Sequence, residues 1–190
     1  MRPFDFVIAF LAFIYALALT HLLLAIAHMI RHRRRVRLDF VHTVWMLNAL
    51  LLLFANWISL WDFHKLEQLS LATILSGLFY GVNQYLVCAL VAPRLDGEDG
   101  FDMHAFQESQ GRTYIAAFAV LVLVSIPLNF LAGSDVNVQN WTRENAVVFG
   151  MLAVVLPPLF FRARWVQVAA PIAFLFLVGT YLVEFYPVLR

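Results

Sequence analysis

Long apolar segments alternate with short polar stretches along the whole chain. A helix needs about 20 largely apolar residues to cross a bilayer, and it satisfies its own backbone hydrogen bonds there. The segments lack the alternation of apolar and polar residues that marks the ~10-residue strands of a membrane β-barrel. The pattern therefore predicts an all-α polytopic membrane protein, a single bundle of six transmembrane helices over residues 4–30, 40–61, 71–92, 113–131, 145–161 and 165–186.

Composition also favours a membrane location. Apolar residues make up 63% of the 190 residues, and the mean hydropathy is +0.80. A soluble domain of this composition would expose much apolar surface to water at about 25 cal/mol per Å², whereas lipid removes that cost. The first segment is too long for a signal peptide and carries Asp5, so we expect it to be retained. The longest polar stretch, 93–112, is expected to be a cytoplasmic loop.

The positions of Lys and Arg predict how the six helices are oriented. Nine of the 13 fall in loops on one side of the predicted membrane, and the first of these loops contains Arg31, Arg33, Arg34, Arg35 and Arg37. Because loops rich in Lys and Arg stay in the cytoplasm, this side is predicted to be cytoplasmic and both termini extracytoplasmic. Pairing of this basic loop with the acidic residues of 93–112, or with anionic lipid, is one interpretation. Two separately solvated loops are the simpler one.

Two histidines stand out in the first segment. His21 falls near the middle of the predicted membrane, and His28 lies seven residues further on roughly the same helical face. A titratable group at this depth is costly and points to a function, and histidine titrates near neutral pH. His21 is therefore a candidate proton carrier or cation gate. The structural alternative is a neutral histidine that is hydrogen-bonded to a neighbouring helix.

The second and third segments carry further polar side chains. Asn48 and Asn56 lie eight residues apart in the second segment, and asparagine commonly joins membrane helices by hydrogen bonds. Gly77 and Gly81 form a small-xxx-small pair that lets another helix approach the third segment. Beside them a polar stripe recurs at helical spacing, made of Thr73, Ser76, Tyr80, Asn83 and Gln84. These polar groups either line a water-filled path or bond helices together, and in both cases the third helix is expected to be central.

Cofactor and enzyme chemistry find little support in the residues. The single cysteine, Cys88, lies inside the third segment, so neither an intramolecular disulfide nor a Cys-based metal cluster is expected. No catalytic or metal-binding residues are predicted. A haem held by two histidines needs imidazoles at matching depth, and His28 and His42 are the pair that fits. Nucleic acid is not expected as a partner, because the arginines lie at the membrane.

Several short runs resemble a group of small, uncharacterised bacterial membrane proteins with six helices. They are Thr20-His21-Leu22-Leu23, the basic Arg33-Arg34-Arg35-Val36, and the spaced His42, Trp45 and Trp57. The resemblance implies a location in the bacterial inner membrane and no particular activity.

These features predict a small channel or transporter for protons, ions or a small solute, with its path beside His21 and the polar stripe of the third segment. The alternative is a non-catalytic membrane scaffold or accessory subunit of a larger complex, in which the polar groups join helices and the loops dock a partner membrane protein. A haem-binding or enzymatic membrane protein is the third possibility. We expect the chain to lie in contact with membrane lipid and to form a homo-oligomer.

Overall fold

The computed structural model describes residues 3–60, 70–93, 101–132 and 145–185, and these form a helical bundle. Two short strands, β1 (Val36–Arg37) and β2 (Phe101–Asp102), pair in parallel. The helices are α1 (Pro3–Arg31), α2 (Phe40–Ser59), α3 (Leu71–Val91), α4 (Met103–Ala132), α6 (Ala146–Val155), α7 (Pro157–Phe160) and α8 (Arg164–Phe185). Within the described ranges, five helices (α1, α2, α3, α4 and α8) are long and apolar enough to cross a membrane. The helical class predicted from the sequence is thereby confirmed, and the five apolar helices fit a membrane protein.

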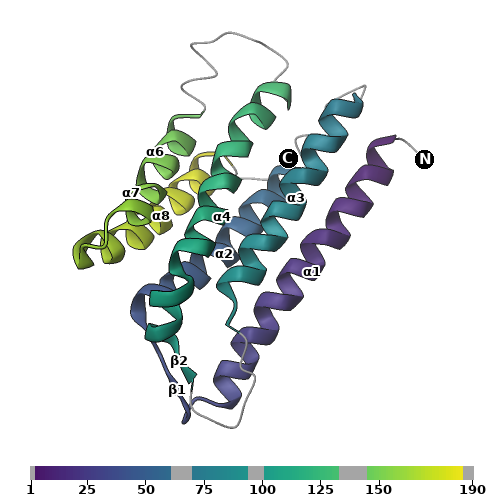
Figure 1. The fold of residues 1–190 in the computed structure, drawn as a ribbon. Coiled ribbons are helices and arrows are strands. Elements are labelled where there is room, and N and C mark those ends of the chain that lie inside the picture. The colour runs from purple at the N-terminus through teal and green to yellow at the C-terminus, as the bar shows by residue number, and fades with distance from the viewer. Residues whose placement is uncertain (1–2, 61–69, 94–100, 133–144, 186–190) are drawn as a thin grey trace.

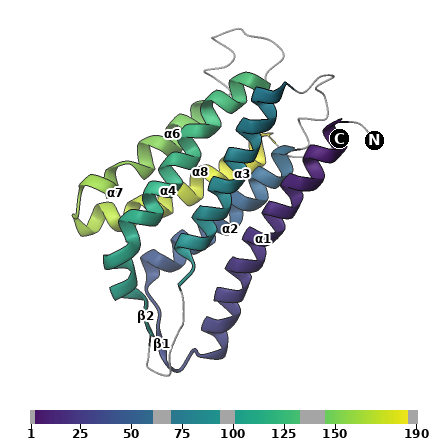
Figure 2. The same cartoon turned by 45° about the vertical axis from the view of Figure 1, so that its right-hand side comes forward.

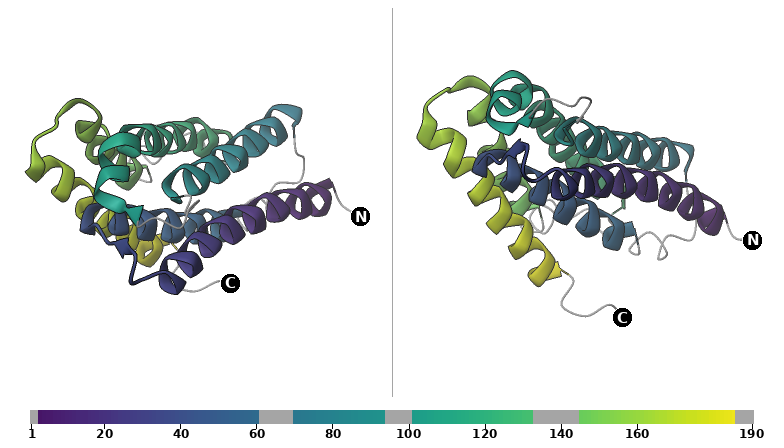
Figure 3. Two further views of the ribbon diagram at one scale, coloured as in Figure 1. Left: turned by 60° about the horizontal axis from the view of Figure 1, so that its bottom comes forward. Right: turned by 90° about the horizontal axis from the view of Figure 1, so that it is seen from below.

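The helices lie in two layers (Figure 1 and Figure 3). One layer contains α1, α2 and α8, and the other contains α3, α4 and the pair α6–α7. The middle helix of each layer, α2 or α4, contacts both its neighbours in the layer and helices across from it. Helices α2 and α4 are accordingly more buried than α1 and α8. The sequence predicts a central α3, but α2 occupies that position because α3 lies at the edge of its layer.

Strands β1 and β2 mark one end of the bundle, which we call the strand end. Helices α1 and α3 end there and α2 and α4 begin there, while the start of α1 and the end of α8 lie at the opposite end (Figure 1 and Figure 2). In the strand pair, Val36 lies opposite Phe101 and Arg37 opposite Asp102. The basic segment after α1 is thus joined to the segment before α4. The simpler interpretation from sequence, two separately solvated loops, does not hold for these residues.

Two helix boundaries differ from those predicted. α4 begins at Met103 instead of residue 113, because its first turns form an amphipathic helix whose polar side chains resemble a loop in sequence. Met103 and Tyr114 are buried there, while His104 and Glu108 are exposed. The predicted fifth span, 145–161, is interrupted between α6 and α7. The proline pair that opens α7 causes this break, since proline lacks the N–H that continues a helix.

Three aromatic rings join the two layers in the middle of the bundle. The ring of Trp45 on α2 lies 5.0 Å from that of Phe118 on α4 and 5.8 Å from that of Phe174 on α8, and the two phenylalanine rings are 5.6 Å apart. All three side chains have no exposed surface. Tilted and edge-on rings at these distances attract one another in addition to burying area. This aromatic triangle fixes α8 against α2 and α4.

Helix α3 approaches α1 most closely at its glycines. A Cβ added at Gly81 would lie 3.2 Å from a methyl group of Leu11 on α1, whereas one added at Gly77 would lie 3.8 Å from Leu11. A cavity of about 30 Å³ lies beside Gly77, lined by residues of α1, α3 and α4 and the end of α2. The small-xxx-small pair predicted from the sequence therefore faces a neighbouring helix, and α1 is that helix.

We expect Gly77→Ala and Gly81→Ala to change stability in opposite directions. Alanine favours a helix over glycine by about 0.5–1 kcal/mol, and at Gly77 the new methyl group meets ordinary contacts beside a cavity. At Gly81 the methyl group forces Leu11 to move, and overpacking of this kind costs about 1–3 kcal/mol. Equilibrium unfolding in mixed micelles measures both variants. Equal stability changes at the two positions would show that α1 does not pack on Gly81 as described.

Candidate functional site

Helix α2 carries buried polar side chains along most of its length. Its first turn is fixed by Asp39, which has extended backbone angles and whose Oδ1 accepts a hydrogen bond from the His42 backbone N–H at 2.9 Å. An acceptor at this position satisfies one of the free N–H groups at a helix start. Four polar side chains that follow on α2 are buried or nearly so, namely His42, Trp45, Asn48 and Asn56, whereas Thr43 and Trp57 are exposed.

Two amides join α2 to α3 near the opposite end from the strands. Asn56 Nδ2 donates to Gln84 Oε1 at 2.7 Å, and Gln84 Nε2 lies 3.6 Å from Cys88 Sγ. Gln84 has no exposed surface and Asn56 is 6% exposed. On the other side of α3, Asn83 Nδ2 donates to the Ala117 carbonyl of α4 at 3.4 Å. We call Asn56 and Gln84 the amide pair.

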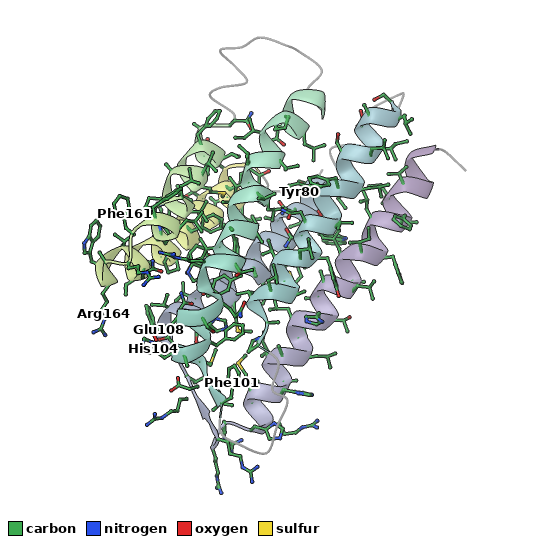
Figure 4. All side chains as sticks on the ribbon, viewed as in Figure 1. Tyr80, Phe101, His104, Glu108, Phe161 and Arg164 are labelled. Carbon is green, nitrogen blue, oxygen red and sulfur yellow. The ribbon has the colours of Figure 1, made fainter. Side chains whose placement is uncertain are left out.

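The remaining members of the predicted polar stripe have local surroundings. Thr73 lies in the first turn of α3, where its backbone N–H donates to Ser70 Oγ at 3.1 Å and the two hydroxyls are 2.8 Å apart. Tyr80 is buried and lines the small cavity beside Gly77, and Ser76 is half-buried (Figure 4). Thr73 thus stays at the start of α3 and Asn83 bonds to α4, whereas Tyr80 and Gln84 both meet Asn56 of α2.

The two histidines of α1 lie apart from these groups. His21 is half-buried, and its ring meets the ring of Tyr85 edge-on at 6.2 Å. His28 is exposed and its ring lies 6.3 Å from that of His32, whereas His42 is fully buried on α2. The pair proposed from sequence to hold haem thus differs in burial, and the two rings have different neighbours.

One turn apart on α2, three buried residues form what we call the buried row: His42, Trp45 and Asn48. Asn48 Nδ2 donates to the Pro171 carbonyl of α8 at 2.8 Å. Within the described ranges, Nδ1 and Nε2 of His42, Nε1 of Trp45 and Oδ1 of Asn48 have no hydrogen-bond partner. The sequence predicted an interhelical hydrogen bond for Asn48, and for His42 it offered only the role of a haem ligand. The spacing of three residues between His42, Trp45 and Asn48 could have indicated that they share one face of the helix.

Charged and titratable side chains meet at the strand end. Asp39 Oδ2 lies 3.1 Å from His104 Nδ1, and His104 Nε2 lies 3.6 Å from Glu108 Oε1 on the next turn of α4 (Figure 4). Arg37 and Asp102 form an ion pair at 3.8 Å. We call these five residues the strand-end cluster. Sequence reasoning missed His104 and Glu108 because it placed them in a loop, although their spacing of four residues fits a helix.

The predicted basic loop is exposed at the end of α1. Its arginines, together with His32, line an open hollow of about 420 Å³. The lining residues are Arg31, His32, Arg33, Arg34 and Arg35. Such a concentration of positive charge beside apolar helices suits the negatively charged headgroups of a membrane surface.

Comparisons of this chain with protein-family models, curated proteins and solved structures find no match in any of the three.

The amide pair gives a direct test of the role of the polar stripe. We expect Asn56→Leu and Gln84→Leu each to destabilise the bundle, because the remaining amide is buried without its partner. The double variant should lose less than the sum of the two. A double-mutant cycle by equilibrium unfolding should yield a coupling of about 0.6–1.7 kcal/mol, the range of hydrogen bonds between membrane helices. Additive effects would mean that the bond does not hold α2 to α3.

A second test concerns the start of α2. Asp39→Ala removes the acceptor for the His42 N–H and should cost about 0.5–2 kcal/mol of stability. Asp39→Asn is the matched control, because asparagine is an equally good cap but lacks the negative charge beside His104. The asparagine variant should recover most of the loss in the same unfolding assay. If both variants lose the same stability, the contribution of Asp39 comes from its charge and not from the cap.

Proposed function

We propose that the chain crosses the bacterial inner membrane six times, with the strand end in the cytoplasm and both termini outside. The fifth crossing in chain order is the broken helix formed by α6 and α7, whose 15 residues, Ala146–Phe160, are apolar but fewer than in the other spans. The basic residues after α1 support this orientation. The exposed aromatic side chains Phe161 and Trp165, beside Arg164 at the turn into α8 (Figure 4), support a membrane interface at this turn, since aromatic residues gather at both interfaces.

Within this orientation, we propose that the protein is a non-catalytic scaffold or accessory subunit of the membrane. The observation that carries this proposal is the pairing of the buried amides between helices. Gln84, which lies in the predicted transport path, is fully buried and bonded to Asn56, and Asn83 is bonded to α4. Polar groups used in this way hold helices together and leave none of these amides free to accompany a moving solute.

The strand end supplies the surface that a scaffold needs. The β1–β2 pair and the ion pair between Arg37 and Asp102 give the two adjoining segments a fixed arrangement instead of that of loose loops. The hollow at the end of α1 adds a concentrated positive charge. We propose that this end docks an acidic cytoplasmic surface of a partner membrane protein, next to anionic lipid.

Transport of protons, ions or a small solute is a second candidate. The unpaired polar atoms of His42, Trp45 and Asn48 favour it, because a buried group without a protein partner is available to a moving molecule. A transport path would then follow α2. His21, beside which the sequence predicted the path, would lie outside it.

Two measurements separate the candidates. Purification in mild detergent after crosslinking should yield one stoichiometric partner, and Arg33→Glu with Arg34→Glu should abolish it. The same change at Arg162 and Arg164, near the turn between α7 and α8, is the control and should leave the partner bound. Isolation of the wild-type chain alone, or equal loss in both double variants, would contradict docking at the strand end.

Liposome flux at several pH values provides the second measurement. A scaffold predicts that wild type, His21→Ala and His42→Ala are all indistinguishable from empty liposomes. Flux in the wild type that falls in His42→Ala would establish the transport candidate instead. Flux that falls only in His21→Ala would restore the path beside α1.

A further inference from the structure

The open hollow at the end of α1, which we call the basic hollow, concentrates positive charge that the chain does not neutralise. Arginine side chains and His32 line its volume of about 420 Å³. Arg37, just beyond it, is paired with Asp102. In the part of the chain that the structure describes, Arg31, Arg33 and Arg34 have no acidic partner. The hollow therefore suits an anionic ligand that comes from outside the chain.

The backbone that carries these arginines is held in place. At the end of α1, the N–H of His32 donates to the His28 carbonyl at 2.9 Å, and the N–H of Arg35 donates to the His32 carbonyl at 2.8 Å. The Arg35 carbonyl in turn accepts from the N–H of Phe101 in β2 at 3.0 Å. The arginine side chains thus start from a fixed turn, and this reduces the ordering cost of binding a ligand.

The side-chain chemistry of the basic hollow favours phosphate among anions. A guanidinium group is planar, keeps its charge, and presents paired N–H donors that match two oxygens of one phosphate. The three arginines without an acidic partner carry more charge than the single negative charge of one phosphate diester. The volume of the hollow also lies within the range of about 300–1,000 Å³ that small-molecule sites have. A ligand with two phosphates therefore fits the hollow better than a ligand with one.

Exposed apolar side chains flank the arginines along the chain, and they indicate a lipid. Ile30 precedes the arginines and is 62% exposed, while Leu38 and Phe40 follow them and are 73% and 62% exposed. A phospholipid offers phosphate to the arginines and acyl chains to these apolar side chains, and basic pockets at the ends of membrane helices bind such headgroups. An acidic protein surface or a free phosphate compound would match the charge alone.

We infer that the basic hollow is a binding site for an anionic phospholipid whose headgroup contains two phosphates, the chemistry of diphosphatidylglycerol. Arg31, Arg33 and Arg34 bind the phosphates, and the acyl chains lie against the apolar side chains that flank the hollow. The inference deepens the proposed function, on whose contact between the strand end and anionic lipid it rests. It adds the site and the class of lipid.

Native mass spectrometry of the purified chain in detergent micelles, titrated with one lipid at a time, tests the site. One diphosphatidylglycerol should bind per chain, about tenfold more tightly than phosphatidylglycerol, because its second phosphate adds a charge. Phosphatidylethanolamine, which has no net charge, gives the baseline. Pyrophosphate has two phosphates but no acyl chain, so it should not displace the lipid at equal concentration. Displacement by pyrophosphate would overturn a lipid as the ligand.

Two double variants locate the lipid. Arg33→Gln with Arg34→Gln should weaken diphosphatidylglycerol binding about 30-fold, which corresponds to about 1 kcal/mol for each arginine at a membrane surface. Arg162→Gln with Arg164→Gln removes the same charge near the turn between α7 and α8 and should leave binding unchanged. All four side chains are exposed, so the bundle should tolerate both variants. Equal loss in the two double variants, or equal binding of all three lipids by the wild type, would overturn the site.

The lipid titration uses the chain without any partner, so its outcome is distinguishable from that of the crosslinking experiment. A chain that binds diphosphatidylglycerol at the basic hollow but purifies without a partner would support this site and contradict the scaffold. A chain that yields a partner but does not distinguish the three lipids would overturn this site and leave the scaffold in place.

Discussion

The bundle depends on one constraint, the absence of water as a hydrogen-bonding partner in the hydrocarbon core. A polar side chain that enters this region gains by bonding to another part of the protein, and where the partner lies on another helix the bond determines which helices touch. Asn56 and Gln84 bring α2 to α3, Asn83 reaches α4, and Asn48 reaches α8. Apolar packing between helices offers little discrimination in lipid, since the tails are as apolar as leucine. A few amide side chains therefore have a large part in selecting which helices pack together.

The same constraint applies to backbone carbonyls in the second half of the chain, which contains several prolines. A proline leaves a carbonyl of the preceding turn without its N–H donor and interrupts the helix. At the break between α7 and α8, Gln167 Nε2 donates to the carbonyls of Pro158 and Phe161 at 2.9 and 2.8 Å. On α8, the Pro171 carbonyl accepts from Asn48. Gln167 thus supplies a donor to carbonyls at the end of α7, and Asn48 joins α2 to the backbone of α8.

Sequence reasoning recovered what depends on local composition and missed what depends on distant neighbours. The long apolar runs predict four helices, α1, α2, α3 and α8, with both ends close to those observed, because twenty apolar residues in succession have few other folds in lipid. The polar first turns of α4 were mistaken for a loop, since periodicity in Met103, His104 and Glu108 is weak over so short a stretch. Spacing placed Asn83 and Gln84 on one stripe, but they bond to opposite neighbours. A periodic pattern gives the face of a helix and not the helix that covers it. The opposite charges of the two loops indicated that they could pair, but no pattern in the sequence indicated the strand register that brings Arg37 to Asp102.

Helices α2 and α3 carry similar numbers of polar residues, yet only α2 keeps unpaired atoms, and the reason lies in what each helix meets. The amides of α3 meet another amide or a backbone carbonyl, both of which complete a hydrogen bond. His42 and Trp45 instead meet ring edges of Phe106, Tyr114 and Phe118, which offer attraction between rings but no acceptor in the plane of the imidazole or indole. An aromatic environment holds these side chains in place without satisfying them. Of the buried unpaired polar atoms in the described residues, four therefore lie on α2, one of them the amide oxygen of Asn48, and a fifth is the Tyr15 hydroxyl on α1.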